Sequence, residues 1–441
     1  MRERFPRLFD AFIWPAVICA DATMILIFTA SAFLVLWRLG GEHADLAYVG
    51  GAYWLIYIPM APLWARLGGR TGLRRVSLFG ASVVVVATLL LAHAGSILQV
   101  CAVTGLLGFG ASAMWPNIEA ELSLGREGPV LRRRLAFFNV MWNCGLILGP
   151  LLGALVYPER EAAQGPDGRA LVNVAFRTAS VLAAGLWVCL ALWRPHVPEA
   201  DEVRRGLERE GGRDPVRLRA FWLMAFVANF MAYVVIGVLR HLYEKLASYQ
   251  WADEQAAAER HHMLLVIMAV AAVLTYVVLF VAHRWHYRLK RHVAWQAAVA
   301  AGLLLVALTG SVAWSAVGFV VIGAGTAFVY SGSLFYSIEG HDTTTHMAGW
   351  HEAVLGGGSL AGLLLTGHVP KLLEALGVES SYWLVRSPYL AAAALFAVGI
   401  LVQLTIYARH ARRFAGPASS GTMAPQGRRC RKREKKTRFS A

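Results

Sequence analysis

The chain has few charged residues and no long polar stretch in which a soluble domain could fold. Charged residues occupy 16% of the 441 positions, whereas 57% are hydrophobic, and the mean hydropathy is +0.51. A water-soluble domain of this size rarely combines such values. A glycine-rich nucleotide-binding loop, a nucleophile elbow and a zinc-protease motif are also missing from the sequence. These absences argue against an enzyme and against the use of ATP by this chain.

Cysteine is scarce, and the spacing of the histidines matches no compact zinc motif. Four of the five cysteines fall inside apolar runs and the fifth lies in a basic tail, so no external disulfide framework is expected. Near the last third of the chain, ligating side chains gather at His341, Asp342, His346, His351 and Glu352. Their spacing does not favour a zinc site, and we expect neither a metal nor a cofactor.

What the sequence does contain is a series of apolar runs long enough to cross a membrane. A helix needs about 20 apolar residues to span roughly 30 Å of hydrocarbon. Twelve such spans are predicted, which makes the fold class all-α integral membrane, with two six-helix bundles. The expected spans are 12–37, 44–65, 76–95, 98–120, 135–157, 173–193, 218–239, 263–282, 293–310, 313–336, 348–368 and 387–407.

A charged stretch divides the spans into two sets of six. The predicted domains are an N-terminal bundle (1–193), a cytoplasmic linker (194–217), a C-terminal bundle (218–407) and a disordered basic tail (408–441). If the N-terminus is cytoplasmic, 33 of the 42 Lys and Arg residues fall in cytoplasmic segments. This bias predicts that both termini are cytoplasmic. It also accounts for the net charge of +15 through topology and anionic lipid, without nucleic acid.

The loop after the second span carries the most specific local motif, Ala65-Arg-Leu-Gly-Gly-Arg70-Thr-Gly72-Leu-Arg74-Arg75. Together with the two sets of six spans, it resembles the major facilitator superfamily of secondary transporters. Arg70, Gly72 and Arg74 match the family's loop, in which they are implied to serve gating. Gly69 stands where the family usually has an aspartate that latches one conformer, so this chain is expected to latch differently. The alternative is a simple positively charged hairpin on the cytoplasmic side.

The fifth span contains small residues four positions apart. The run Gly145, Gly149, Pro150 and Gly153 resembles the signature of drug:proton antiporters within the same superfamily. Glycines at this spacing let two helices approach closely, and ordinary tight packing explains them equally well. The eleventh span, which is the positional counterpart, has Gly358 and Gly362. Matching small-residue faces in both halves are typical of a duplicated fold.

Asp21 is the clearest ionisable residue inside a span. It lies near the middle of the first span without a local cation. A charged side chain at the bilayer centre costs about 3 kcal/mol on insertion scales, so its presence calls for a reason. We expect Asp21 to couple protons or to contact substrate. A hydrogen-bonded structural carboxyl is the alternative.

Three further residues, Glu119, His351 and Glu352, are candidates for proton coupling. Glu119 and Glu121 end the fourth span near the predicted cytoplasmic surface; we expect Glu121 to be exposed and Glu119 to line an inner vestibule. His351 and Glu352 open the eleventh span one turn inside its predicted start. Because histidine titrates near neutral pH, this pair suits a proton relay, with helix-end hydrogen bonding as the alternative.

Polar and aromatic residues within the spans could line a central substrate cavity. The candidates are Tyr53, Tyr57, Asn139, Trp142, Asn143, Asn229, Tyr233, Tyr330, Ser333 and Tyr336. Asparagines also join membrane helices without contacting a ligand. Since no Lys or Arg lies centrally, a neutral, amphipathic or cationic organic molecule is favoured over a dianion, and aromatic rings could hold a cation.

Together these features predict a monomeric secondary transporter in a bacterial inner membrane. It would move a small organic solute by alternating access, with proton-coupled export as the leading interpretation. Uptake by proton symport remains open, because the direction depends on coupling. A transporter-shaped assembly factor or sensor that no longer transports is the alternative from a different class.

Overall fold

A computed structural model describes residues 10–41, 43–126, 128–156, 165–194, 215–251, 254–282, 285–339 and 344–414. Within these ranges, twelve helices are long and apolar enough to cross a membrane. This confirms the predicted class. Most of the central linker (195–214) and the tail from 415 onward lie outside the described residues.

The first half of the chain forms six of the spans. The helices are α2 (Ile13–Phe33), continued by the π-helical turn η1 (Leu34–Arg38), α3 (His43–Thr71), α4 (Leu73–Leu91), α5 (Ile97–Ser123), α6 (Gly128–Val156) and α8 (Gly168–Leu192). Gly72 joins α3 to α4 with φ at +110°, a conformation that a side chain would strain. The glycine is what permits this short turn.

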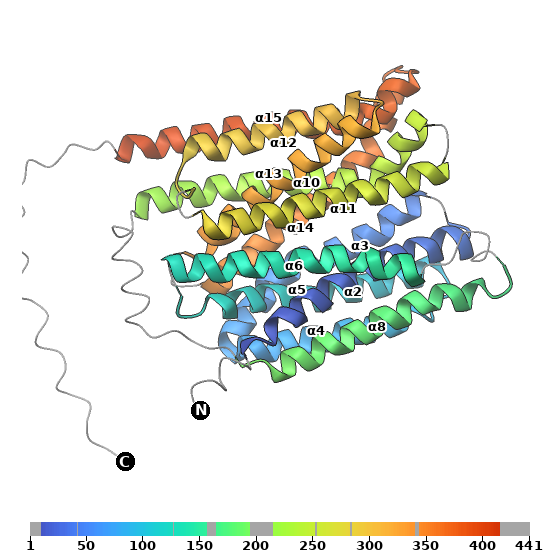
Figure 1. Cartoon of the computed structure of the whole chain (residues 1–441), viewed down its shortest axis with the longest axis horizontal. Helices are drawn as coiled ribbons and strands as arrows, with labels where there is room; N and C mark the ends of the chain where they lie inside the picture. Colours follow the sequence, from blue (N-terminus) through green and yellow to red (C-terminus); the bar gives the residue numbers. More distant parts are fainter. Residues whose placement is uncertain are drawn as a thin grey trace, which may run out of the picture.

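The second half forms the other six. They are α10 (Pro215–Trp251), α11 (Glu254–Val281), α12 (Leu289–Leu308), α13 (Val312–Ile338), α14 (Thr344–Ala375) and α15 (Ser381–Phe414). Figure 1 shows the helices of the first half gathered below those of the second. Several helices extend beyond the predicted spans: α10 continues to Trp251, α14 begins earlier and ends later, and α15 includes the first residues assigned to the tail.

Close glycine contacts occur at equivalent places in the two halves. In the first half, a Cβ on Gly145 of α6 would lie 2.8 Å from Asp21 Cβ of α2. In the second, a Cβ on Gly358 of α14 would lie 2.9 Å from Tyr233 Cβ of α10. The small residues of the fifth and eleventh spans therefore serve tight packing on the first helix of their own half.

The two halves meet along α3, α5 and α6 on one side and α11, α13 and α14 on the other. Helix α14 packs against both α3 and α5, and α11 packs against α6. In Figure 1, α14 and α11 lie next to the helices of the first half. Side chains on the facing surfaces of these helices are therefore the ones that change partners if the halves move.

Candidate functional site

Two carboxyl groups and a histidine meet at the boundary between the halves. Glu119 lies one turn before the end of α5, and His351 with Glu352 lie two turns into α14. All three are buried, with 1%, 0% and 4% of their surface exposed. One ligand atom from each lies within 4.8 Å of the others. We call these three residues the carboxyl–histidine cluster.

The two carboxyl groups are joined by a side-chain hydrogen bond. Such a bond needs a proton on one of the two groups, because an ionised carboxylate only accepts. Each is also held by a tyrosine: Tyr57 of α3 donates to Glu352 Oε2, and Tyr330 of α13 donates to Glu119 Oε1 at 3.2 Å. Among the described residues, no lysine or arginine pairs with either carboxyl group.

His351 completes the cluster with one nitrogen engaged. Its Nδ1 lies 3.0 Å from Ser333 Oγ, and its ring packs against that of Tyr330 at 5.2 Å. Within the described ranges, the buried Nε2 has no hydrogen-bond partner, nor does Glu119 Oε2 have a donor. Leaving a buried polar atom unsatisfied costs about 1–3 kcal/mol, so a bound ion, water or ligand would stabilise the site. The three groups are close enough to hold a metal ion, which the sequence did not lead us to expect.

Asp21 connects to the cluster through aromatic side chains. Trp142 Nε1 of α6 donates to Asp21 Oδ1 at 2.9 Å. The Trp142 ring stacks on Tyr330 with centroids 4.9 Å apart, and Tyr330 in turn binds Glu119. Asp21 and Glu119 thus lie at the two ends of one contact chain that passes from the first half to the second and back.

Most other cavity candidates surround this chain of contacts. Tyr53 stacks on Tyr57 at 5.5 Å, and Tyr233 faces Tyr330 at 6.2 Å. Asn139 Nδ2 donates to Ser331 Oγ of the other half at 3.3 Å.

The two remaining asparagine candidates differ in their partners. Asn143 donates to the carbonyl of Asn139 one turn earlier. Asn229, one turn before Tyr233 on α10, is fully buried, and neither its Oδ1 nor its Nδ2 has a partner in the described part of the chain.

Tyr336 belongs to a different group. Its hydroxyl accepts from the backbone N–H of Tyr287, and its ring packs against Phe221. The structure does not bring it to the carboxyl–histidine cluster.

The expected exposure of Glu121 is incorrect, because the helices packed against α5 bury its side chain. Only 7% of its surface is exposed, and the charge of Arg74, in the first turn of α4, acts on it. The expected position of His351 and Glu352 also changes. Because α14 begins at Thr344, they lie in the interior of a helix rather than at its opening.

Arg74, in the first turn of α4, joins the α3–α4 turn to the rest of its own half. Its guanidinium donates to the carbonyls of Leu190 and Ala191, the last turn of α8. A cation at a helix C-terminus satisfies carbonyls that have no partner within the helix. Arg70 is exposed.

Sequence reasoning missed a contact between the halves near this loop. Arg66 Nη2 lies 2.8 Å from His346 Nε2, which joins α3 to α14. The two residues are 280 positions apart, and neither stands in a pattern that marks the other as its partner.

A twelve-helix bundle in two halves, with titratable groups buried where the halves meet, is the architecture of a secondary transporter. The profile of the Major Facilitator Superfamily matches residues 13–363. The chain belongs to this family.

Individual relatives are more distant. A "multi-drug resistance efflux pump PmrA homolog" of Lactococcus lactis is 32% identical over 112 residues, which cover 25% of this chain and 28% of that protein. The chain thus matches little more than a quarter of this relative's length.

Solved structures of transporters share the fold over nearly the whole chain. The human organic anion transporter MFSD10 is 15% identical with a TM-score of 0.61, covering 90% of this chain and 99% of that one. The fucose:proton symporter FucP of Escherichia coli is 14% identical with a TM-score of 0.62, covering 89% and 98%. At such identities the similarity shows the fold alone.

Proposed function

We propose that this protein is a proton-coupled secondary transporter that exports a small organic solute, and that the Glu119–Glu352 pair carries the coupled proton. The observation behind the proposal is that the pair joins one half of the molecule to the other through a hydrogen bond that needs a proton. In alternating access the halves rock about a central site, so contacts between them distinguish the states.

The geometry links loss of the proton to movement of the halves. With the proton present, the two carboxyl groups attract each other. Without it, two negative charges less than 5 Å apart face each other. At an effective dielectric constant of 20 this repulsion is roughly 3 kcal/mol, about a hundredfold in the ratio of two conformers. Deprotonation therefore favours separation of α5 from α14.

The same site favours an organic cation as the transported solute. Among the described residues, no lysine or arginine lies beside the two carboxyl groups, so the deprotonated pair would keep its negative charge. The rings of Tyr57, Tyr330 and Trp142 lie around the pair. Carboxylates and aromatic faces together bind ammonium groups. A cation that balances the pair's charge would compete with its proton, which is the requirement for exchange.

Asp21 would act as the second carboxyl group of this route, and Tyr53, Asn139, Asn143, Asn229, Tyr233 and Ser333 as its polar lining. The similarity of the fifth span to drug:proton antiporters and the part-length efflux-pump relative favour export. We place the protein as a monomer in the inner membrane, with both termini cytoplasmic and with its basic segments at anionic lipid.

The experiment is solute-dependent proton flux in proteoliposomes that contain the full chain and an internal pH dye. Amphipathic amines are compared with neutral compounds of the same shape. We expect the amines, and not the neutral compounds, to cause proton movement, with protons moving in the direction opposite to the amine. We expect this signal to be lost in Glu352→Gln. Co-movement of proton and solute would replace export with symport. Silence with every compound, from folded and inserted protein, would favour the assembly factor or sensor.

Glu121→Gln is the matched control. Glu121 is also a buried glutamate of α5, two positions from Glu119, but it does not belong to the carboxyl–histidine cluster. If Glu121→Gln abolishes flux as strongly as Glu352→Gln, the assignment of the proton to the Glu119–Glu352 pair is wrong.

A further inference from the structure

One face of α14 lies along α3 and forms the most continuous contact between the halves. Its members recur every three positions: His346 contacts Arg66, Glu352 contacts Tyr57, and Gly349 lies between them. A Cβ on Gly349 would lie 2.7 Å from Ala65 Cβ. We call this contact the α3–α14 seam.

The outermost member of the seam is a histidine whose protonation state is fixed by its partners. His346 Nε2 lies 2.8 Å from Arg66 Nη2 and 3.1 Å from Trp350 Nε1. Arginine and tryptophan nitrogens donate and do not accept, so Nε2 must be the acceptor of both bonds. The observed contact therefore requires a neutral imidazole.

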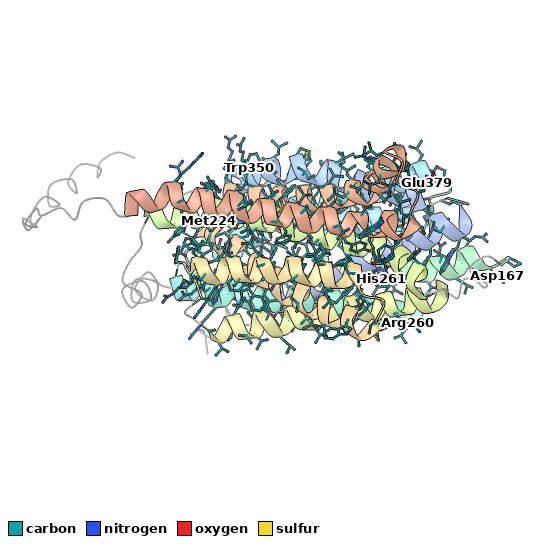
Figure 2. All side chains as sticks on the ribbon, turned by 90° about the horizontal axis from the view of Figure 1, so that it is seen from above. Asp167, Met224, Arg260, His261, Trp350 and Glu379 are labelled. Carbon is teal, nitrogen blue, oxygen red and sulfur yellow. The ribbon has the colours of Figure 1, made fainter. Side chains whose placement is uncertain are left out.

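The position of the seam's end gives His346 access to the aqueous phase. His346 is half-buried and Arg66 is exposed. Figure 2 shows Trp350 toward one end of the bundle and the loop residues Asp167 and Glu379 toward the other. This end is the one at which α3 passes into α4 through Gly72.

We propose that His346 is a pH-sensing residue that locks this end of the transporter when neutral and releases it when protonated. A proton on Nε2 removes the acceptor of both hydrogen bonds and places an imidazolium beside a guanidinium. Free histidine titrates near pH 6.5, so acidification on this side favours the conformer open to this side.

Few other groups compete for this role. From α3, Arg66 is the charged side chain that acts on the imidazole among the described residues, and from α14 itself the neighbour is Trp350. His351 and Glu352 lie more than one turn deeper and are buried. The lock does not depend on which ion drives transport, so it goes beyond the proposed function.

The test is a distance measurement between the halves at two pH values. Spin labels are placed at Thr71 and Lys290, exposed positions at this end on α3 and α12. The full chain is reconstituted in nanodiscs after replacement of its own cysteines by serine: Cys19, Cys101, Cys144, Cys189 and Cys430. We expect a longer distance to gain population, roughly tenfold, between pH 8 and pH 5.5, as loss of a hydrogen bond to a charged group implies.

Two substitutions at one position give opposite results. His346→Gln keeps an acceptor that does not titrate, so the short distance should persist at both pH values. His346→Lys keeps a positive charge beside Arg66, so the long distance should dominate at both. A misfolded protein would not produce this opposite pair of results.

His410→Gln is the control, because His410 lies at the same end on α15 and, among the described residues, its hydrogen bond is to the Ile406 carbonyl of its own helix. It should retain the full response to pH. The proposal is overturned if the unsubstituted histidine gives one distribution at both pH values, or if His346→Gln responds to pH as the parent does. Glu352→Gln separates the two proposals. It removes the carboxylate repulsion that would part α5 from α14 at high pH, so it should lose coupled flux, whereas the gain of the longer distance at low pH, which depends on His346, should remain.

Discussion

Glu119 and Glu352 share a hydrogen bond across the boundary between the two halves, although 233 positions separate them in the chain. Tyrosine hydroxyls hold both groups, and no described cation neutralises them. A carboxyl pair in this environment is stable when it holds a proton. In the proposed function, this relationship couples the protonation state of the pair to the arrangement of the halves.

Tyr57→Phe should change the pH dependence of transport without abolishing it. The substitution keeps the aromatic ring and removes the hydroxyl that donates to Glu352. Since that hydroxyl stabilises the carboxylate, its loss favours the protonated pair. A hydrogen bond to a charged group contributes about 1.5–3 kcal/mol, and one pH unit corresponds to 1.36 kcal/mol. We expect the pH profile of transport to move up by roughly one to two units; a profile that moves down would contradict this role of Tyr57.

Asp21→Asn should leave the fold intact and remove solute-dependent proton flux. Asparagine retains an acceptor for the Trp142 indole, which now donates to Asp21 Oδ1. The variant therefore removes the group that can ionise at position 21 and keeps the size of the side chain and its hydrogen bond to Trp142. The measurements are proton flux and thermal unfolding in detergent. Unchanged pH dependence would make Asp21 a structural carboxyl group.

Gly349→Val should prevent closure of the end at which α3 meets α14. Its first side-chain atom would lie 2.7 Å from Ala65 Cβ and 2.8 Å from Pro62 Cα, closer than packed atoms approach. We expect the transport rate to fall at least tenfold, with the labels at this end far apart at every pH. Gly357→Ala is the control, because its Cβ would contact only the Phe230 ring, at 3.5 Å.

Arg74→Gln should lower stability by a small amount. The guanidinium binds the last carbonyls of α8, and these carbonyls would lose a partner. Because Arg74 is partly exposed, we expect only about 1 kcal/mol, seen as a decrease of roughly 1–2 °C in Tm. The control is Arg75→Gln, since the exposed Arg75 binds, within the described part of the chain, the nearby carbonyl of Thr71 and no carbonyl of α8. Equal decreases in both variants would show a general charge effect.

The candidate site was only partly accessible from the sequence. Glu119, His351 and Glu352 could each be selected, because an ionisable residue within an apolar run is costly and conspicuous. Their assembly into one cluster could not be inferred, and the burial of Glu121 was missed. The assembly of the cluster and the burial of Glu121 both depend on how closely α3, α5 and α14 approach one another. This distance cannot be inferred from the sequence of any one span.

The sequence by itself determined the twelve spans and their division into two sets of six. Whether a segment can span the bilayer depends on its own hydrophobicity and length, and both are local properties of the chain. Only the tertiary structure decided that Glu119 meets Glu352 and that His346 accepts hydrogen bonds from Arg66 and Trp350. It also decided that Tyr336 contacts Tyr287 and not the carboxyl–histidine cluster. Such partners are selected by packing summed over whole helix faces. A residue's own neighbours in the chain carry little of that information.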